Sequence, residues 1–166
     1  GMFQTGDLII YGSTGVCEVT GIQPSKFPGE EGLYYTLSPR YSSETIYIPV
    51  DSPVFMRRVI SREQAETLIG QIPEVQESAT HSDHRQMAEQ YEASLKTHDC
   101  TELLRIIKTA YLKTRRSVQS GRKPGQTDQR YLKRAETQLY GELAVALGIQ
   151  PDEVKGYIEK SVRTAH

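Results

Sequence analysis

Basic residues are concentrated in one stretch of the chain. Residues 105–134 contain ten Lys and Arg residues and one acidic residue, Asp128, so this stretch carries a charge of +9. Such a block favours a polyanionic partner, and nucleic acid is the commonest one. The alternative is a solvated helical face that only keeps the chain soluble. Charge alone leaves both interpretations open.

The spacing of these cations places most of them outside the apolar stripes of the helices that we predict for this region. Eight of them lie on the outer side of one helix, in the turn that follows, and at the start of the next helix: Lys108, Arg115, Arg116, Arg122, Lys123, Arg130, Lys133 and Arg134. If the two helices are antiparallel, these side chains gather near one turn. They would then contact phosphates with little sequence specificity.

Cysteine and histidine show no arrangement typical of catalysis or metal binding. Cys17 and Cys100 are far apart, and the histidines form no His-x-x-x-His pair: His81, His84, His98 and His166. No phosphate-binding glycine loop and no nucleophile elbow follows a strand. We expect no cofactor, no metal, no disulfide and a reducing cytoplasm. An enzyme that uses Cys100, placed at a helix start where thiolates are favoured, stays open as an alternative.

The two halves of the chain differ in charge. Residues 1–78 hold 5 basic and 10 acidic residues, whereas residues 79–166 hold 15 basic and 11 acidic residues. This asymmetry predicts two modules with different partners. No apolar run approaches the roughly 18 residues of a membrane span, so we expect no membrane contact.

The acidic half has the pattern of short strands separated by Gly- and Pro-rich turns. We predict strands over 7–11, 16–22, 33–37, 45–49 and 54–56. This spacing favours a small antiparallel barrel. A helix with Ser61 as its N-cap and an end at Pro73 follows, and we expect the barrel to pack against it. The predicted first domain is 1–72.

The basic half has the pattern of helices. Residues 73–83 are polar and form the predicted linker. Helices are then expected to begin at about Ser82 or Asp83, after Asp99 and Thr127, and at Pro151, with Gly148 ending the third. The predicted second domain, 84–166, has about four helices. The fold class is therefore α+β.

The ordered motifs of the chain resemble those of the CarD/CdnL family of bacterial transcription regulators. Family segments are resembled, in the same order, by the opening segment 3–16 (FQTGDLIIYGSTGV), the strands 34–37 (YYTL) and 46–50 (IYIPV), the stretch 95–99, the helix 102–113 and the segment 132–144. The first part also resembles the RNA polymerase-interacting domain of the transcription-repair coupling factor. The resemblance implies a Tudor-like first domain.

The resemblance further implies that the first domain binds the β subunit of RNA polymerase by pairing a sheet edge with a strand of that subunit. The residues that match the contact strand are Ile46, Tyr47 and Ile48. Family members often carry a basic residue where Tyr47 stands, so an ion pair there is expected to be missing. The alternative for Tyr47 is a surface aromatic that shields an edge.

In the family, the second domain contacts promoter DNA and inserts a tryptophan into the minor groove. This sequence contains no tryptophan. His84 stands at the matching position and is followed by Arg85. A His ring is a poorer wedge between base steps, and the alternative for His84 is a solvent-exposed residue at a helix start.

These features predict a non-enzymatic transcription regulator. The first domain would tether a basic helical domain near upstream promoter DNA, which raises its effective concentration there. The alternative is a polymerase-binding adaptor that has lost DNA contact, which would show no salt-dependent DNA binding. We expect a monomer.

Overall fold

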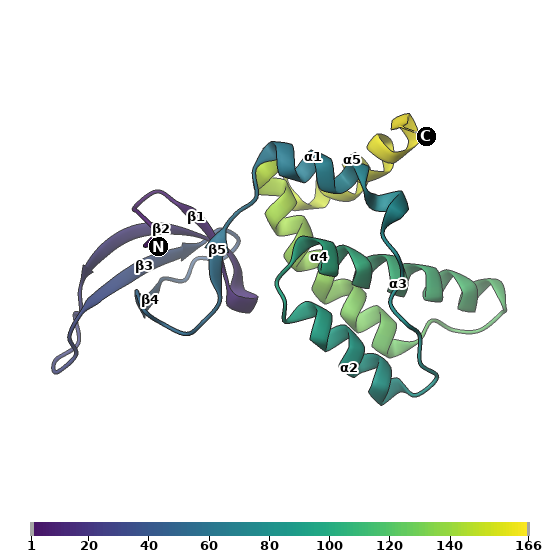
Figure 1. Cartoon of the computed structure of the whole chain (residues 1–166), viewed down its shortest axis with the longest axis horizontal. Coiled ribbons are helices and arrows are strands. Elements are labelled where there is room, and N and C mark those ends of the chain that lie inside the picture. The colour runs from purple at the N-terminus through teal and green to yellow at the C-terminus, as the bar shows by residue number, and fades with distance from the viewer. Residues whose placement is uncertain (1, 166) are drawn as a thin grey trace. The chain divides into compact units, whose positions relative to one another are not determined.

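The computed structural model describes residues 2–165 and divides the chain into two compact units, Gly1–Ile60 and Ser61–His166. The first unit contains all of the β-strands and the second all of the α-helices that are described (Figure 1). The predicted α+β class is confirmed.

The first unit is a five-stranded sheet in which every neighbouring pair of strands is antiparallel. The strands follow the order β4-β3-β2-β1-β5 across the sheet. Their bounds are β1 Leu8–Tyr11, β2 Gly15–Pro24, β3 Leu33–Pro39, β4 Ile46–Pro49 and β5 Met56–Arg58, with a 3₁₀ turn η1 at Gly12–Thr14. The five predicted strands are therefore present, although the last begins two residues later than expected.

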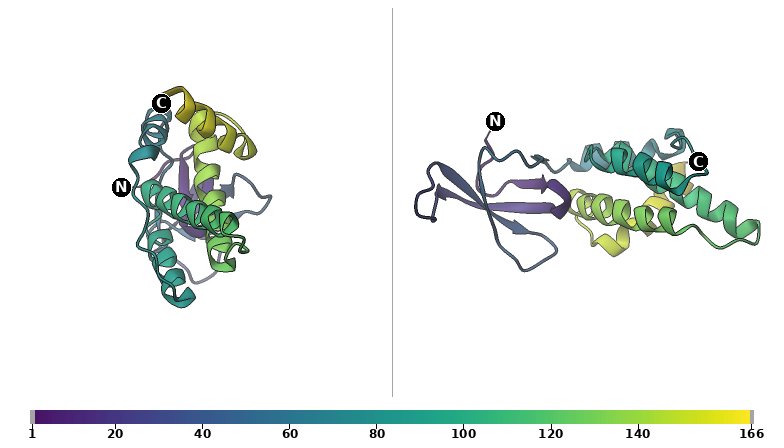
Figure 2. Two further views of the ribbon diagram at one scale, coloured as in Figure 1. Left: turned by 90° about the vertical axis from the view of Figure 1, so that its right-hand side faces the viewer. Right: turned by 90° about the horizontal axis from the view of Figure 1, so that it is seen from below.

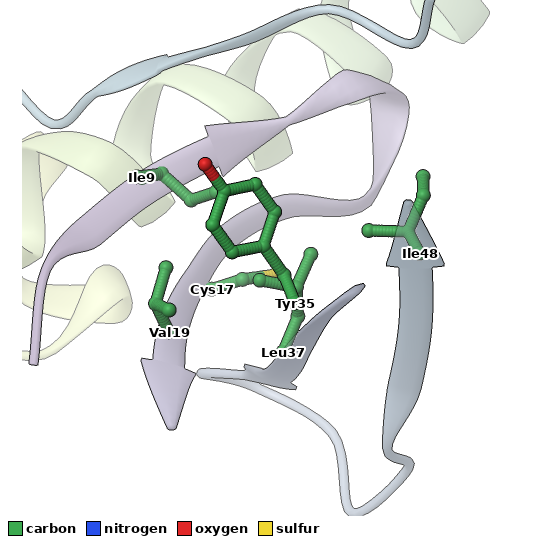
Figure 3. Close-up of a cluster of buried hydrophobic side chains, with 6 residues drawn as sticks. All are labelled: Ile9, Cys17, Val19, Tyr35, Leu37 and Ile48. Atoms are coloured by element: carbon green, nitrogen blue, oxygen red, sulfur yellow. The ribbon is translucent and has the colours of Figure 1, made fainter. Parts of the chain in front are cut away.

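One face of this sheet forms the core of the first unit. Figure 3 shows its buried side chains, which come from four strands and surround the Tyr35 ring: Ile9, Cys17, Val19, Tyr35, Leu37 and Ile48. The Tyr35 hydroxyl accepts a hydrogen bond of 3.0 Å from the Phe3 backbone. Alternation along β3 and β4 places Tyr35, Leu37 and Ile48 on this face, as a strand period of two requires.

The expected closed barrel is corrected to an open sheet. Within residues 2–165, β4 pairs only with β3 and β5 only with β1, so the two outer strands do not join. Alternating short strands fit a closed barrel and an open sheet equally, because alternation fixes faces but not the partner of an edge strand. The open arrangement leaves β4 with one unpaired edge.

The second unit contains five α-helices. They are α1 Arg62–Gly70, α2 His84–Leu95, α3 Cys100–Gln119, α4 Gln126–Leu147 and α5 Pro151–Ala165, with a 3₁₀ turn η2 at Ile72–Glu74. The helix α1, which we expected to support the sheet, packs against α4 and α5. Arg62 donates a hydrogen bond of 3.1 Å to the Leu147 carbonyl. The helical unit therefore begins at Ser61 and has one helix more than the four expected.

Most of the predicted helix boundaries are confirmed. Ser61 forms a capping box with Gln64, and Asp99 accepts hydrogen bonds from two backbone N–H groups of the first turn of α3. Gly148 ends α4 in the left-handed conformation, with a φ of 71°. The exception is Thr127, which lies inside the first turn of α4 while Gly125 takes the N-cap position.

The helices α3 and α4 form the centre of the second unit and lie side by side (Figure 2). The ion pair between Lys113 and Asp128, at 3.1 Å, joins them close to the turn that connects them. The predicted stripe of Met87, Tyr91 and Leu95 on α2 is buried. Within residues 2–165, no helix combines the length and the apolar character that crossing a lipid bilayer requires.

Candidate functional site

The open edge of β4 offers backbone hydrogen-bonding groups to a partner. The Val50 N–H donates to the Leu33 carbonyl at 3.0 Å. Hydrogen-bonded pairs alternate along an antiparallel ladder, so Ile48 also directs its polar backbone groups toward β3. Tyr47 and Pro49 therefore direct theirs away from the sheet.

Pro49 limits how far this edge can pair. Proline has no N–H and is tolerated at an outward-facing position of an edge strand. Within β4, Tyr47 is consequently the residue that offers both a donor and an acceptor to the open edge, whereas Pro49 offers a carbonyl only. Strand addition at this edge would be centred on Tyr47.

The side chains of the three predicted contact residues have different surroundings. Ile48 is 7% exposed and Ile46 packs against the same core, whereas Tyr47 lies on the opposite face and is 43% exposed. The Lys26 ammonium lies 4.9 Å from the centre of the Tyr47 ring. This distance is typical of a cation–π contact. Ile46 and Ile48 thus hold the strand in place, and Tyr47 presents a side chain to solvent.

Lys26 was not foreseen as part of this edge. It lies in the connection between β2 and β3, about twenty residues before Tyr47 along the chain. Only the pairing of β3 with both neighbours brings the two residues together. Lys26 therefore adds a positive charge beside the exposed side chain of the β4 edge strand.

The predicted cation Lys108 is used inside the helical unit. Its ammonium donates hydrogen bonds to three backbone carbonyls, those of Ile72 at 2.9 Å, Pro73 at 3.3 Å and Val75 at 2.8 Å. It therefore fastens the segment after α1 to α3.

Neighbouring contacts continue this attachment along α3. Arg105 donates to the Gln76 carbonyl at 2.8 Å, and Arg116 pairs with Glu77 at 3.1 Å. The Ser78 N–H donates to the hydroxyl of Thr109 at 2.8 Å, and both residues are buried. We call residues 72–78 the strap. The first half of the predicted linker 73–83 is thus held against a helix.

Two other predicted cations, Arg130 and Arg134, contact an aromatic ring of their own helix α4, and Arg134 also contacts α2. Arg134 pairs with Glu92 at 3.1 Å, and the guanidinium groups of Arg134 and Arg130 each lie 5.1 Å from the centre of the Tyr131 ring. The hydrogen bond from the Tyr131 hydroxyl is the main cause that lowers the pKa of the Glu92 carboxyl, and Arg134 adds to this effect. Glu92 therefore stays ionised and holds α2 against α4.

The remaining predicted cations are exposed and have no ion pair among the described residues. They lie at the end of α3, in the turn between α3 and α4, and on the first turns of α4: Arg115, Arg122, Lys123 and Lys133. Together with Arg130, which contacts the Tyr131 ring, they give this end of the helical unit a cationic surface suited to phosphates.

The start of α2 faces the same end of the helical unit. Tyr91 contacts Asp128 near the start of α4, whereas the short connection after α2 leads to Cys100, which contacts Glu142 near the end of α4. The helix α2 therefore runs in the same direction as α4. His84 and Arg85 are exposed in the first turn of α2, and Arg85 pairs with Glu89 at 3.7 Å. The fold thus orients both residues toward the end that carries the 120–125 turn.

A buried polar network fixes the position of α2. The Tyr91 hydroxyl donates to Asp128 at 2.7 Å, and the Lys113 ammonium lies 3.1 Å from the same carboxylate oxygen. Burial and the neighbouring Asp128 carboxylate raise the pKa of Tyr91. The Tyr91 and Tyr131 rings stack with their centres 5.2 Å apart. Asp128, the one acidic residue of the basic stretch, therefore has an internal role.

The cysteine and histidine residues form no recognisable reaction centre in the part of the chain that the structure describes. Burial raises the pKa of the Cys17 thiol to about 11. The Cys100 thiol donates to the buried carboxylate of Glu142 at 3.3 Å. Within residues 2–165, no three His, Cys, Asp or Glu side chains are grouped so as to hold a metal ion. His166 lies outside the described residues.

Comparison with known families identifies the first unit. Residues 3–60 match the family model described as the CarD-like/TRCF RID domain. No curated protein matches the chain. The matched residues span the five-stranded sheet, including the β4 edge, and the resemblance noted in the sequence is confirmed for them. The first unit of this chain belongs to the CarD-like/TRCF RID family.

Proposed function

We propose that this protein is a non-enzymatic transcription factor that binds RNA polymerase through its RID domain and promoter DNA through its helical unit. The observation that supports the first contact most directly is the open β4 edge in a domain of this family. Main-chain hydrogen bonds from such an edge supply affinity, and alternate side chains supply specificity. The partner would be a strand of the polymerase β subunit, paired with Ile46–Ile48.

The proposed DNA contact uses the exposed cations at the 120–125 end of the helical unit. These are Arg115, Arg122, Lys123, Arg130 and Lys133, joined by His84 and Arg85 from α2. Lys108, Arg116 and Arg134 have internal partners and would add only to the surrounding potential. Because tethering raises the local concentration of DNA, individually weak phosphate contacts suffice.

The polymerase contact can be tested with a variant that alters only the outward side of β4. Tyr47→Pro removes the outward N–H without removing a bond to β3, whereas Tyr47→Ala keeps the N–H. With the full-length chain and the isolated β subunit, we expect Tyr47→Pro to weaken binding by about tenfold or more and Tyr47→Ala to weaken it less. Equal binding by the wild type and a folded Tyr47→Pro chain would reject strand addition at this edge.

The DNA contact can be tested by its dependence on salt. Arg122→Glu combined with Lys123→Glu changes two residues that lie in a turn and have exposed side chains. Each phosphate contact that is lost lowers the slope of log affinity against log salt by about 0.9. The control is Arg40→Glu, which changes an exposed cation of the first unit. If the wild-type chain has no salt-dependent affinity for duplex DNA, the proposed DNA contact is rejected. The function that remains is that of a polymerase-binding adaptor, which the internal pairing of Lys108, Arg116 and Arg134 favours.

A further inference from the structure

An apolar groove runs along the helical unit between α3, α4 and α5. It has a volume of about 420 Å³. Its lining is mainly aliphatic and aromatic, with contributions from all three helices: Leu104, Ile107, Tyr111, Leu132, Tyr140 and Ile158. The Tyr111 side chain is 51% exposed. Neither the RNA polymerase contact nor the DNA contact proposed above uses this groove.

The apolar surface continues from the groove toward the turn that carries the exposed cations. Tyr111, Arg115 and Val118 are spaced i, i+4 and i+7 on α3 and therefore lie on one face of that helix. Val118 is 57% exposed, the highest value among the exposed large hydrophobic side chains. From Leu104 to Val118 the surface is about 21 Å long, because an α-helix rises about 1.5 Å per residue.

The charges around this surface are uneven. At the turn end, Arg115, Arg122 and Lys123 are exposed and have no ion pair among the described residues. At the α5 end, the lining includes Glu136 and Glu159 together with Lys155. A partner with acidic groups at one end is therefore attracted to the turn end and repelled by the carboxylates at the other end.

We infer that the groove binds an amphipathic helix of a partner protein, with its apolar face against Leu104, Ile107 and Tyr111 and its acidic end at the 120–125 turn. A length of about 21 Å corresponds to about four helical turns. Apolar side chains spaced i, i+3 or i+4, and i+7 would fill the groove, as in other helix-in-groove complexes. DNA does not fit this part of the surface, because a duplex has no apolar face to cover the aliphatic lining.

One consequence rests on the proposed DNA contact. Arg115, Arg122 and Lys123 cannot pair with acidic side chains of a helix and with DNA phosphates at the same time. The partner helix would therefore compete with DNA for this end of the helical unit, and its binding would release the promoter contact while the RID domain stays attached to its own partner.

The test uses a fluorescein-labelled synthetic helical peptide about 18 residues long, with Leu residues on one face and Glu residues at one end. A second peptide has Lys in place of each Glu. With the full-length chain and no DNA present, we expect the Glu peptide to bind about tenfold more tightly than the Lys peptide. Amide NMR signals of Ile107, Tyr140 and Ile158 should shift on titration.

Surface variants then separate the groove from general charge attraction. Tyr111→Ser and Val118→Ser should each weaken peptide binding by about fivefold or more. Phe27→Ser is the matched control, because Phe27 is also 51% exposed but lies in the first unit. The inference is overturned if no saturable binding occurs up to about 1 mM, if both peptides bind equally, or if Tyr111→Ser and Val118→Ser have no effect. Because these measurements contain no DNA and no polymerase, they fail or succeed independently of the proposed function.

Discussion

The Lys108 ammonium donates a hydrogen bond of 2.8 Å to the carbonyl of Val75. This contact joins a residue in the middle of α3 to the strap, which the sequence had indicated to be part of a linker. The same ammonium also reaches two further carbonyls of the strap. A cation that the charge pattern assigned to DNA therefore holds part of the fold together, and its replacement should affect stability more than DNA affinity.

Lys108→Met should destabilise the helical unit by about 1.5–3 kcal/mol, the range for hydrogen bonds that involve a charged group. The measurement is urea unfolding of the full chain followed by circular dichroism. Arg115→Met is the control, since Arg115 is exposed and should change stability by less than about 0.5 kcal/mol. An equal effect of the two variants would show that the three carbonyl contacts of Lys108 contribute little.

Tyr91→Phe should also destabilise the helical unit, by about 1–3 kcal/mol, because it removes the donor to Asp128 within a buried network. Asp128→Ala should cost more, about 3–5 kcal/mol, since it leaves Lys113 without its partner. Tyr111→Phe serves as the control because the Tyr111 side chain is 51% exposed. Unfolding midpoints that do not differ among the three variants would contradict a stabilising network.

The stability of the chain should decrease in acid partly because of Glu92. The Tyr131 hydroxyl and Arg134 lower the pKa of the Glu92 carboxyl from its ordinary value of 4.5 in the folded state. The stabilisation is therefore complete above pH 4.5 and is lost as the pH falls through the lower folded-state pKa.

The check is the free energy of unfolding of the wild type and of Glu92→Gln between pH 7 and pH 3. The difference between the two chains should be constant above the ordinary Glu pKa of about 4.5 and should shrink below it. A difference that stays constant down to pH 3 would show that the Glu92 carboxyl has the same pKa in the folded and unfolded chains.

Cys17 should resist alkylation in the native chain. Its side chain is fully buried in the core of the sheet, and burial raises its thiol pKa to about 11, so almost no thiolate forms at pH 8. Iodoacetamide followed by mass spectrometry should show modification of Cys17 only after unfolding in guanidinium. Rapid native modification of a Cys100→Ser chain, whose one remaining thiol is Cys17, would contradict this expectation.

The short apolar runs between Gly- and Pro-rich turns were enough to predict the five strands. The buried residues Ile9, Val19, Leu37 and Ile48 all lie within them. The capping residues Ser61, Asp99 and Gly148 were readable because a cap is a local interaction between neighbours in the chain. The order of motifs also sufficed to indicate the family, which the match over residues 3–60 supports.

Only the tertiary structure decided which polar groups are available. The charge count could not show that Lys108 and Arg116 contact the strap or that Arg134 pairs with Glu92, because these partners are distant in sequence. The open edge of β4 likewise depends on which strands pair, and alternation does not encode that choice. The sequence alone thus determined the local elements and their faces, whereas long-range packing determined which cations and which backbone groups remain free to bind a partner.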